Sequence, residues 1–192
     1  MKYLSIVILL AAVVSGCASP RGTADLTNET LAAATQPAGG LTQGNYVEEL
    51  AALVYPPAGW ESDGLREQSS VYSKHWVSPG GRTAFGVIHF ELPVHAAIVP
   101  HGIVIDRYVD KQRETEGAGT LIEKAWDDQL GGTRFVSQGQ LYYTRNYLVT
   151  RGYDGWFVYA GTLVDQPVDE PALETAVAAR EATRLGAMPV AE

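Results

Sequence analysis

Two neighbouring segments near the carboxyl end of the chain, residues 141–151 and 156–164, are rich in large apolar side chains and flank the turn sequence Gly-Tyr-Asp-Gly. Their pattern predicts an antiparallel hairpin in which Arg151 faces Trp156. In that register, Val and Tyr side chains line one face of the hairpin, and Leu, Phe and Tyr side chains line the other. A sheet that is apolar on both faces must be covered on both, so helices are expected on either side of it.

Further strands are predicted from local patterns. Residues 68–77 alternate in polarity and lead through Ser-Pro-Gly-Gly-Arg into residues 83–92, so these two segments form a second hairpin. Residues 120–126 and 134–138 have the same character and are separated by a turn around a pair of glycines. With the first hairpin, these segments predict a mainly antiparallel sheet of about five to six strands.

Helices are expected in three places. Residues 101–116 carry one apolar stripe with charged side chains around it, and Gly117 is placed to end the helix. A final helix is predicted over about residues 169–185. Asn45 and Glu48 have the spacing of a capping box for a short helix that stops at Tyr-Pro-Pro. The fold class is thus α+β, with helices packed on the faces of the sheet.

The amino-terminal end carries a targeting signal. One positive charge is followed by an apolar run that is too short for a lasting transmembrane helix, and then by small residues. This pattern indicates a secretory signal peptide over residues 1–16. Its end, Val14-Ser15-Gly16-Cys17, resembles the lipobox of bacterial lipoproteins. The resemblance implies cleavage before Cys17 and acylation of both its thiol and its new amino terminus.

Lipid attachment accounts for the cysteine content, because Cys17 is the only cysteine in the chain. The mature protein then has no thiol for a disulfide, a nucleophile or a metal site. Two or three acyl chains on one residue hold a protein firmly without a spanning helix. Ala18 differs from the Asp that tends to retain enterobacterial lipoproteins in the inner membrane. We therefore expect an outer-membrane location facing the periplasm, where the organism has one.

The mature chain is expected to have two parts. Residues 17–43 comprise the lipidated cysteine and a run of small and polar residues, which predicts a flexible tether. About 26 such residues have a typical end-to-end distance of roughly 30 Å, enough to hold a domain away from the bilayer. Residues 44–192 have the length of a single domain.

The charge balance disfavours nucleic acid and anionic lipid as partners. The chain has 14 Lys and Arg against 22 Asp and Glu, a formal net charge of −8. Removal of residues 1–16 takes away one base and no acid, which leaves 13 bases, 22 acids and a net charge of −9. Binding to phosphates needs a basic surface, so no nucleic-acid partner is expected. Attachment to the lipid bilayer then depends on the acylated Cys17 alone.

Several sequence features carry a resemblance to known families. They are Pro-Pro-Ala-Gly-Trp at residues 56–60, a closing Gly-Trp-Phe-Val-Tyr strand with a terminal helix after it, and the order of strands and helices. Over about residues 55–186 the chain resembles the α/β/α sandwich of the PsbP-like family. That resemblance implies a non-enzymatic accessory or assembly module that docks to other proteins. The segments GRTAFGVIHFELP, RETEG and LYYTRNYLVTRGYDGWFVYAGTL are also similar to those of uncharacterised planctomycete lipoproteins.

The histidines are candidates for metal ligands. There are four of them: His75, His89, His95 and His101. Zinc needs three or four ligands within about 2.1 Å of one point. In the expected hairpin register Val77 faces Thr83, which places the first two histidines roughly 13 Å apart, too far for one ion. The other two flank the loop at residues 93–100 and are expected to lie at the surface or to anchor the loop, so no metal site is predicted.

Other sequence patterns do not specify a reaction. The chain lacks a Gly-x-Ser-x-Gly nucleophile elbow, a P-loop and a dinucleotide fingerprint. The neighbouring carboxylates Asp127 and Asp128 are expected to point apart in a solvated turn, although two other acids could meet in the fold as a glycosidase pair. We expect no catalytic residue and no cofactor.

Aromatic residues remain as candidates for a binding surface, because Tyr and Trp are enriched at interfaces as well as in cores. Tyr153 lies at the tip of a turn, and with Trp156 and Tyr142 it forms the candidate ligand or partner surface. The sequence thus predicts a membrane-anchored cell-envelope lipoprotein that acts as a non-catalytic binding or assembly module with an envelope protein partner. The alternative is an envelope hydrolase or small-ligand-binding protein that uses the aromatic surface.

Overall fold

The computed structural model describes residues 40–92, 100–164 and 168–186. A seven-stranded antiparallel sheet has the strand order β3-β4-β5-β9-β8-β7-β6. Its strands are β3 (Glu61–Gln68), β4 (Val71–Val77), β5 (Thr83–Glu91), β6 (Gly119–Asp127), β7 (Gly132–Gly139), β8 (Tyr142–Arg151) and β9 (Asp154–Leu163). A second sheet contains β1 (Asn45–Val47), β2 (Ala52–Val54) and β10 (Arg184–Leu185), with the 3-10 helix η1 (Glu48–Leu50) between β1 and β2.

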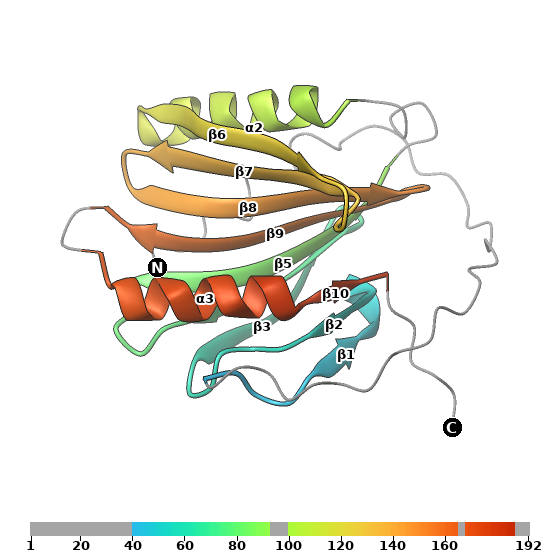
Figure 1. Cartoon of the computed structure of the whole chain (residues 1–192), viewed down its shortest axis with the longest axis vertical. Coiled ribbons are helices and arrows are strands. Elements are labelled where there is room, and N and C mark those ends of the chain that lie inside the picture. Colours follow the sequence, from blue (N-terminus) through green and yellow to red (C-terminus); the bar gives the residue numbers. More distant parts are fainter. Residues whose placement is uncertain (1–39, 93–99, 165–167, 187–192) are drawn as a thin grey trace.

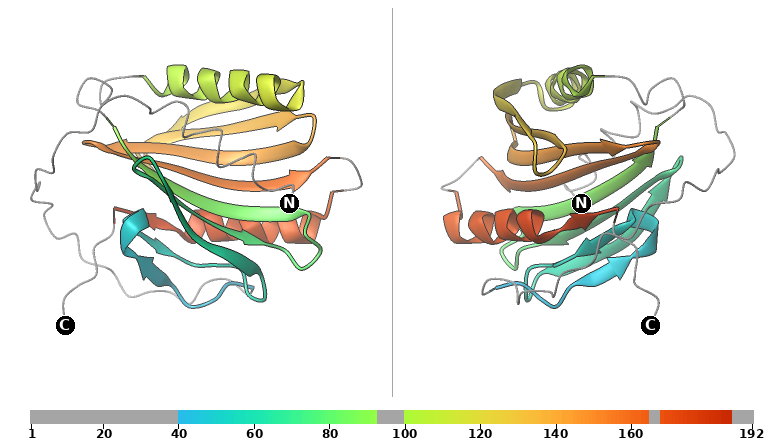
Figure 2. Two further views of the ribbon diagram at one scale, coloured as in Figure 1. Left: turned by 180° about the vertical axis from the view of Figure 1, so that it is seen from behind. Right: turned by 45° about the vertical axis from the view of Figure 1, so that its right-hand side comes forward.

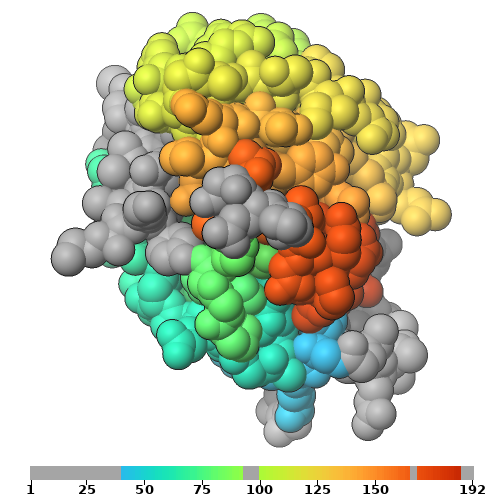
Figure 3. All heavy atoms as spheres, turned by 90° about the vertical axis from the view of Figure 1, so that its left-hand side faces the viewer, coloured from blue at the N-terminus to red at the C-terminus, as the bar shows by residue number. Residues whose placement is uncertain are grey.

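Two helices lie on opposite faces of the large sheet (Figures 1 and 2). Helix α2 (His101–Glu116) packs over β6 and β7, and α3 (Glu170–Ala182) packs over β5 and β9 on the other face. The three-stranded sheet lies on the same face as α3, because its buried side chains share one core with that helix. At one end of the molecule the green surface of the β4–β5 hairpin lies beside the red-orange surface of α3 (Figure 3).

Each face of the large sheet has its own apolar core. On the α3 face, Trp156 and Phe85 pack with Leu173 of the helix and with Leu50 of η1. On the α2 face, aromatic side chains of β7 and β9 pack against Tyr108 of the helix. The expectation of a mainly antiparallel α+β fold with cover on both faces is therefore confirmed, with more strands than the predicted five to six.

The β8–β9 hairpin has the expected faces but a different register. Arg151 pairs with Asp154, so Val149, not Arg151, faces Trp156. The connection is thus two residues long, and Gly152 takes a positive φ of 60° within it. A shift of two residues leaves every side chain on its original face, because strand side chains alternate with period two.

Strand β3 was absent from the expected strand set. It is an edge strand in which seven of its eight residues are exposed, with a sequence, ESDGLREQ, that has no apolar alternation. Strand β4 begins at Val71, because Ser69 and Ser70 take positive φ values and form the turn between β3 and β4. An edge strand with a solvated outer face needs few apolar residues, so hydrophobic patterning cannot detect it.

The short helix expected after Asn45 is wrong. That segment forms β1, η1 and β2, and η1 begins after Val47 without a side-chain cap. Leu50, Ala52 and Val54 are all fully buried in the core of the α3 face. These three buried residues are spaced by two, as in a strand that buries one face. Tertiary burial therefore overrides the local capping signal.

The two long helices match their predicted starts. Gly117 takes a left-handed conformation, with φ of 78°, and ends α2. Asp169 caps α3 by accepting a hydrogen bond from the backbone N–H of Ala172. Helix α3 ends at Ala182 rather than at Leu185, since residues 184–185 pair with β2 instead. Among the described residues, neither helix has both the length and the apolar character needed to cross a membrane.

The folded part of the chain includes some residues expected in the tether. Leu41 forms a β-bridge with Pro57, and the N–H of Thr42 donates to the carbonyl of Pro56. The ordered domain therefore begins before residue 44. The signal peptide, Cys17 and the rest of the expected tether lie outside the described residues.

A buried tryptophan joins the two sheets. The indole Nε1 of Trp156 in β9 donates to the carbonyl oxygen of Leu50 in η1 at 2.8 Å. The ring of His89 stacks on the indole, with 5.2 Å between the ring centres, and its Nδ1 lies 2.9 Å from the carbonyl of Glu49. The small sheet is thus held to the large sheet by directed hydrogen bonds as well as by apolar packing.

We expect Trp156→Phe to lower the free energy of unfolding by about 1–3 kcal/mol, because the buried Leu50 carbonyl loses its donor. Urea unfolding followed by far-UV circular dichroism measures this change. Trp126→Phe is the matched control: Trp126 is 60% exposed, and its indole bond to Asp128 can be replaced by water, so its loss should change stability by about 0.5 kcal/mol or less. Equal effects of the two substitutions would contradict the role given to Trp156.

Candidate functional site

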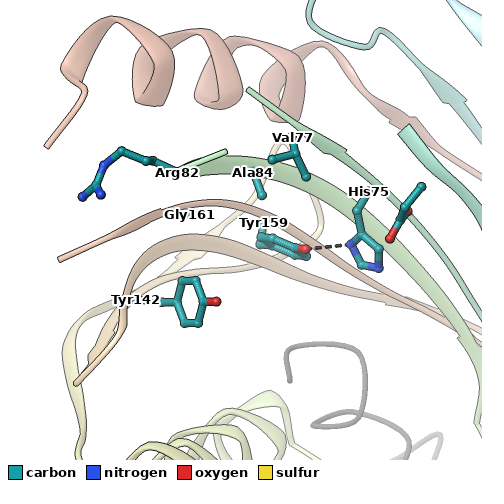
Figure 4. Close-up of a pocket in the computed structure, with 8 residues that line it drawn as sticks. His75, Val77, Arg82, Ala84, Tyr142, Tyr159 and Gly161 are labelled. Carbon is teal, nitrogen blue, oxygen red and sulfur yellow. Dashed lines mark hydrogen bonds between the residues drawn. The ribbon is translucent and has the colours of Figure 1, made fainter. Parts of the chain in front are cut away.

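A small hollow lies on the α2 face of the large sheet (Figure 4). The space that the centre of a water molecule can occupy is about 20 Å³, so the hollow has room for about one water. Strands β3, β4, β5, β8 and β9 and the β4–β5 turn contribute its lining. The lining residues are Asp63, His75, Val77, Arg82, Ala84, Tyr142, Tyr159 and Gly161.

Small residues in register across the sheet create the hollow. Ala84 in β5 pairs with Gly161 in β9, and these two positions place almost no side chain above the sheet. Two residues further along β5, Gly86 pairs with His75 in β4 and with Tyr159 in β9. A Cβ atom at Gly86 would come within 2.5 Å of the Tyr159 ring and 2.7 Å of His75 Nδ1. The absence of a side chain at Gly86 therefore lets these two side chains meet above β5.

His75 and Tyr159 share a buried hydrogen bond. The distance between Nδ1 of His75 and the phenol oxygen of Tyr159 is 2.7 Å, and Figure 4 shows the two side chains pointing toward each other. Both side chains are buried, with 5% and 3% exposure respectively. A direct bond of this length in a site without bulk solvent fixes the orientation of the imidazole.

The second nitrogen of the imidazole is buried but has no hydrogen-bond partner among the described residues. This atom, His75 Nε2, belongs to a ring that lines the hollow. Buried polar atoms in native proteins almost always have a partner, and an exception indicates strain, a bound water or a ligand. One nitrogen of a lining residue is therefore left without a partner among the described residues.

Burial sets the protonation state of the pair. Desolvation lowers the pKa of His75 to about 4; the Asp63 carboxylate opposes this shift and the Arg66 guanidinium adds to it. Desolvation likewise raises the pKa of the Tyr159 phenol well above its usual value. Both groups are thus uncharged over the whole range around neutral pH.

Asp63 and Arg66 form an ion pair on β3 at the edge of the site. Their charged atoms are 2.5 Å apart, and both side chains reach solvent. Asp63 also lines the hollow, so one carboxylate of this pair lies at its rim.

The three residues of the expected aromatic surface do not lie together. Tyr153 is 56% exposed at the tip of the β8–β9 hairpin, as the turn position predicts. Trp156 is 2% exposed and lies in the core of the α3 face, whereas Tyr142 is 5% exposed on the α2 face. Of the three, only Tyr142 lines the hollow.

The histidines have separate structural roles. His75 and His89 lie on opposite faces of the sheet, because Val77 pairs with Ala84 rather than with Thr83. His89 Nε2 contacts Asp154 at 2.9 Å on the α3 face. The two ring nitrogens of His101 lie 2.9 Å from the hydroxyls of Thr133 and Thr150 at the start of α2. His95 lies outside the described residues.

The neighbouring carboxylates of the β6–β7 turn point to different partners. Asp127 accepts a hydrogen bond from the backbone N–H of Leu130 and pairs with Arg134. Asp128 accepts from the indole nitrogen of Trp126 at 2.9 Å. The two side chains thus stabilise the turn and its edge.

Sequence patterns did not identify Tyr159, Gly86 or Asp63 as site residues. The informative signal is a glycine that stands between a histidine and a tyrosine on three adjacent strands. That signal becomes visible only when the β4–β5 register is correct to one residue. The turn closes by a bond from the Ser78 N–H to the Thr83 carbonyl, which shortens the predicted five-residue connection to four.

Comparisons with known proteins find similar folds. The solution structure of cyanobacterial PsbP (CyanoP) from Synechocystis sp. PCC 6803 has a TM-score of 0.57 and 12% sequence identity, and the match covers 81% of this chain and 98% of that one. The domain has a PsbP-like fold. At this identity the likeness establishes the fold alone, and it confirms the PsbP-like architecture expected from the order of elements.

Two further structures match with lower scores. A Pseudomonas aeruginosa protein of unknown function, described as a putative regulator, has a TM-score of 0.39 and 15% identity over 73% of this chain and 95% of that one. A protein from Bacteroides thetaiotaomicron VPI-5482 has a TM-score of 0.34 and 9% identity over 70% of this chain and 45% of that one. No protein-family model matches the chain, and no curated protein matches its sequence.

We expect Gly86→Ala to lower the free energy of unfolding by about 1–3 kcal/mol, because its Cβ would overlap His75 and Tyr159 and force them apart. Urea unfolding measures the loss, and the NMR signals of the His75 ring report the broken hydrogen bond. Gly80→Ala is the control, since nothing lies within 4 Å of a Cβ there. Unchanged His75 signals in Gly86→Ala would contradict this account of the site.

The lowered pKa of His75 predicts a pH-dependent stability. Between pH 6.5 and about 4 the unfolded chain binds a proton at this ring and the folded chain does not. The free energy of unfolding should therefore be fully present above pH 6.5 and fall by about 1.4 kcal/mol per pH unit as the pH decreases, for a total of about 3 kcal/mol. The measurement is urea unfolding at several pH values for wild type and His75→Phe. A difference between them that does not vary with pH would contradict the burial of a neutral His75.

Proposed function

We propose that this chain is a lipid-anchored cell-envelope protein whose PsbP-like domain binds a partner or ligand without catalysing a reaction. The lipobox at Val14-Ser15-Gly16-Cys17 and the signal-like residues before it support the anchor. If acylated Cys17 holds the protein at the membrane, the PsbP-like domain works close to that surface. An outer-membrane position facing the periplasm is part of the same proposal.

The observation that favours binding over catalysis is the burial of the His75–Tyr159 hydrogen bond, whose two side chains are 5% and 3% exposed. General acid–base catalysis is most efficient when the pKa of the catalytic group lies near the working pH. The pKa of His75 lies near 4 and that of Tyr159 lies above its ordinary value, so neither group exchanges a proton readily at neutral pH. A fixed, neutral hydrogen-bonding pair is instead suited to holding a neutral group.

Binding of a small ligand fits the hollow better than hydrolysis does. The lining of the hollow is mostly apolar. The buried His75 Nε2 has no hydrogen-bond partner among the described residues. Hydrolysis requires a nucleophile or an activated water next to a group that titrates, and the buried imidazole is a weak base. A hydrolase activity is therefore the second candidate function, after a binding role.

The anchor is tested by Cys17→Ser in the native host. We expect loss of a metabolically incorporated palmitate label and a shift of the protein from the membrane fraction to the soluble fraction, because the acylated thiol is removed. Ser19→Ala, two residues further on, should keep both the label and the membrane location. Unaltered membrane attachment of Cys17→Ser would rule out a lipid anchor at this residue.

The binding role is tested with the full-length acylated protein in detergent. The protein is incubated with an extract of its own envelope, and retained and released compounds are identified by mass spectrometry. We expect wild type to retain a component that is released chemically unchanged, and Ala84→Val, which fills the hollow, to retain less of it. Product formation that is lost in His75→Phe would instead establish catalysis and overturn the proposal.

A further inference from the structure

Two dipeptides of the chain combine an aspartate with a following glycine: Asp63-Gly64 in β3 and Asp154-Gly155 in β9. In such a pair the backbone nitrogen of the glycine can attack the side-chain carboxyl carbon, because glycine has no side chain to hinder the approach. The fold leaves the first pair open at the edge of the sheet and holds the second within it. We infer that Asp63-Gly64 is a site of spontaneous isoaspartate formation in the folded protein, and that Asp154-Gly155 is not.

The reaction needs no partner other than water. The nitrogen of Gly64 forms a bond to Cγ of Asp63 and loses its proton, and one carboxyl oxygen leaves as water, which gives a cyclic imide. Water then opens the imide at either of its two carbonyl groups. Opening at Cγ restores aspartate. Opening at the former backbone carbonyl leaves the main chain running through Cβ and Cγ, which is isoaspartate.

A β-bulge removes Asp63 and Gly64 from the regular ladder. Two residues of β3 lie there opposite one residue of β4. The flanking pairs are Ser62 with Trp76 and Leu65 with Lys74. The N–H of Gly64 donates to the Ser62 hydroxyl at 3.3 Å, which is longer than the usual range for this type of bond. The attacking nitrogen is therefore not held by the neighbouring strand.

Open space around the dipeptide lets the two reacting atoms approach. Strand β3 is at one end of the strand order, and both residues are exposed. No heavy atom of the described residues lies within 4 Å of a Cβ atom built at Gly64. The backbone of Gly64 has a φ of 86°, a conformation that glycine adopts freely. The peptide can thus rotate toward the carboxyl group without displacing another side chain.

The ion pair with Arg66 does not close the site. The guanidinium contacts the Asp63 carboxylate through one oxygen, Oδ2, and both side chains reach solvent. An exposed ion pair of this kind contributes little to stability, because water replaces either partner at small cost. The carboxyl group is therefore free to turn toward the glycine nitrogen.

Asp154-Gly155 is the same dipeptide in a protected position. Gly155 is buried and pairs with Phe90 of β5 and with Thr150 of β8, and a Cβ atom there would overlap the Phe90 ring. The side chain of Asp154 is 47% exposed, and that of Asp63 is 29% exposed. Access to the glycine nitrogen, not exposure of the carboxylate, therefore separates the two dipeptides.

Conversion would change the rim of the hollow. Asp63 lines the hollow, and its carboxylate opposes the lowering of the His75 pKa. In isoaspartate the free carboxylate is attached directly to Cα, and the main chain gains one carbon atom. The negative charge near His75 therefore moves, and the NMR signals of the His75 ring should report the change.

The test compares the two dipeptides in one sample. Full-length acylated protein in detergent micelles is kept for several weeks at neutral pH, once folded and once in urea, and is then digested at acidic pH. Mass spectrometry with electron-transfer fragmentation distinguishes isoaspartate from aspartate at each position. We expect isoaspartate at residue 63 but not at residue 154 in the folded sample. In urea both positions should react, because unfolding frees both glycine nitrogens.

Asp63→Glu is the matched control. It keeps the negative charge beside Arg66, but its longer side chain must close a larger ring, which forms far more slowly. We expect no isomerisation at residue 63 in this variant. The His75 ring signals should change with age in wild type and stay constant in Asp63→Glu.

Two outcomes would overturn the inference. If residue 63 remains aspartate in the folded sample while both positions react in urea, the fold protects the bulge. If residues 63 and 154 react equally in the folded sample, unfolding of the whole domain controls the reaction rather than the bulge. Reaction at residue 63 alone supports the inference, whether or not the domain binds a ligand.

Discussion

Burial of strand β9 on both of its faces is the constraint on which the rest of the structure depends. Every residue from Gly155 to Thr162 is buried. Trp156 and Val158 point into the core beneath α3, while Phe157 and Tyr159 point into the core beneath α2. Neither helix alone could remove this strand from water, so the chain must place one on each side. The small sheet completes the cover around Trp156.

The same two-sided burial explains why the site has polar atoms in a region without bulk solvent. Tyr159 is a β9 residue that must be buried, and its hydroxyl needs a hydrogen-bond partner there. His75, two strands away, supplies it across the bare backbone of Gly86. Next to this pair the ladder carries Ala84 and Gly161, so the packed core gives way to a hollow. The site is thus a local exception within a core that is otherwise filled by large side chains.

Sequence patterns predicted the parts of the fold that depend on periodicity and missed the parts that depend on register or on solvation. The amphipathic stripe and Gly117 located α2 because both signals act within the helix itself. The faces of β8 and β9 survived a two-residue shift, since that shift preserves alternation. In the β4–β5 hairpin the expected register was wrong by one residue, which put His75 and His89 on one face of the sheet instead of on opposite faces. The meeting of His75 with Tyr159 therefore could not be predicted, because it requires the exact alignment of three strands.

The small sheet brings together the two ends of the described domain. Strand β2 is its middle strand and pairs with β1 from the amino-terminal side and with β10 from the carboxyl-terminal side. The N–H of Gly186 also donates to the carbonyl of Ala51, and Arg151 donates to the carbonyl of Leu185. A pulling force applied at residue 40 acts on this sheet before it reaches β4 and β5. The three short strands are therefore the first part of the described domain to bear such a load, ahead of the strands that carry His75 and Tyr159.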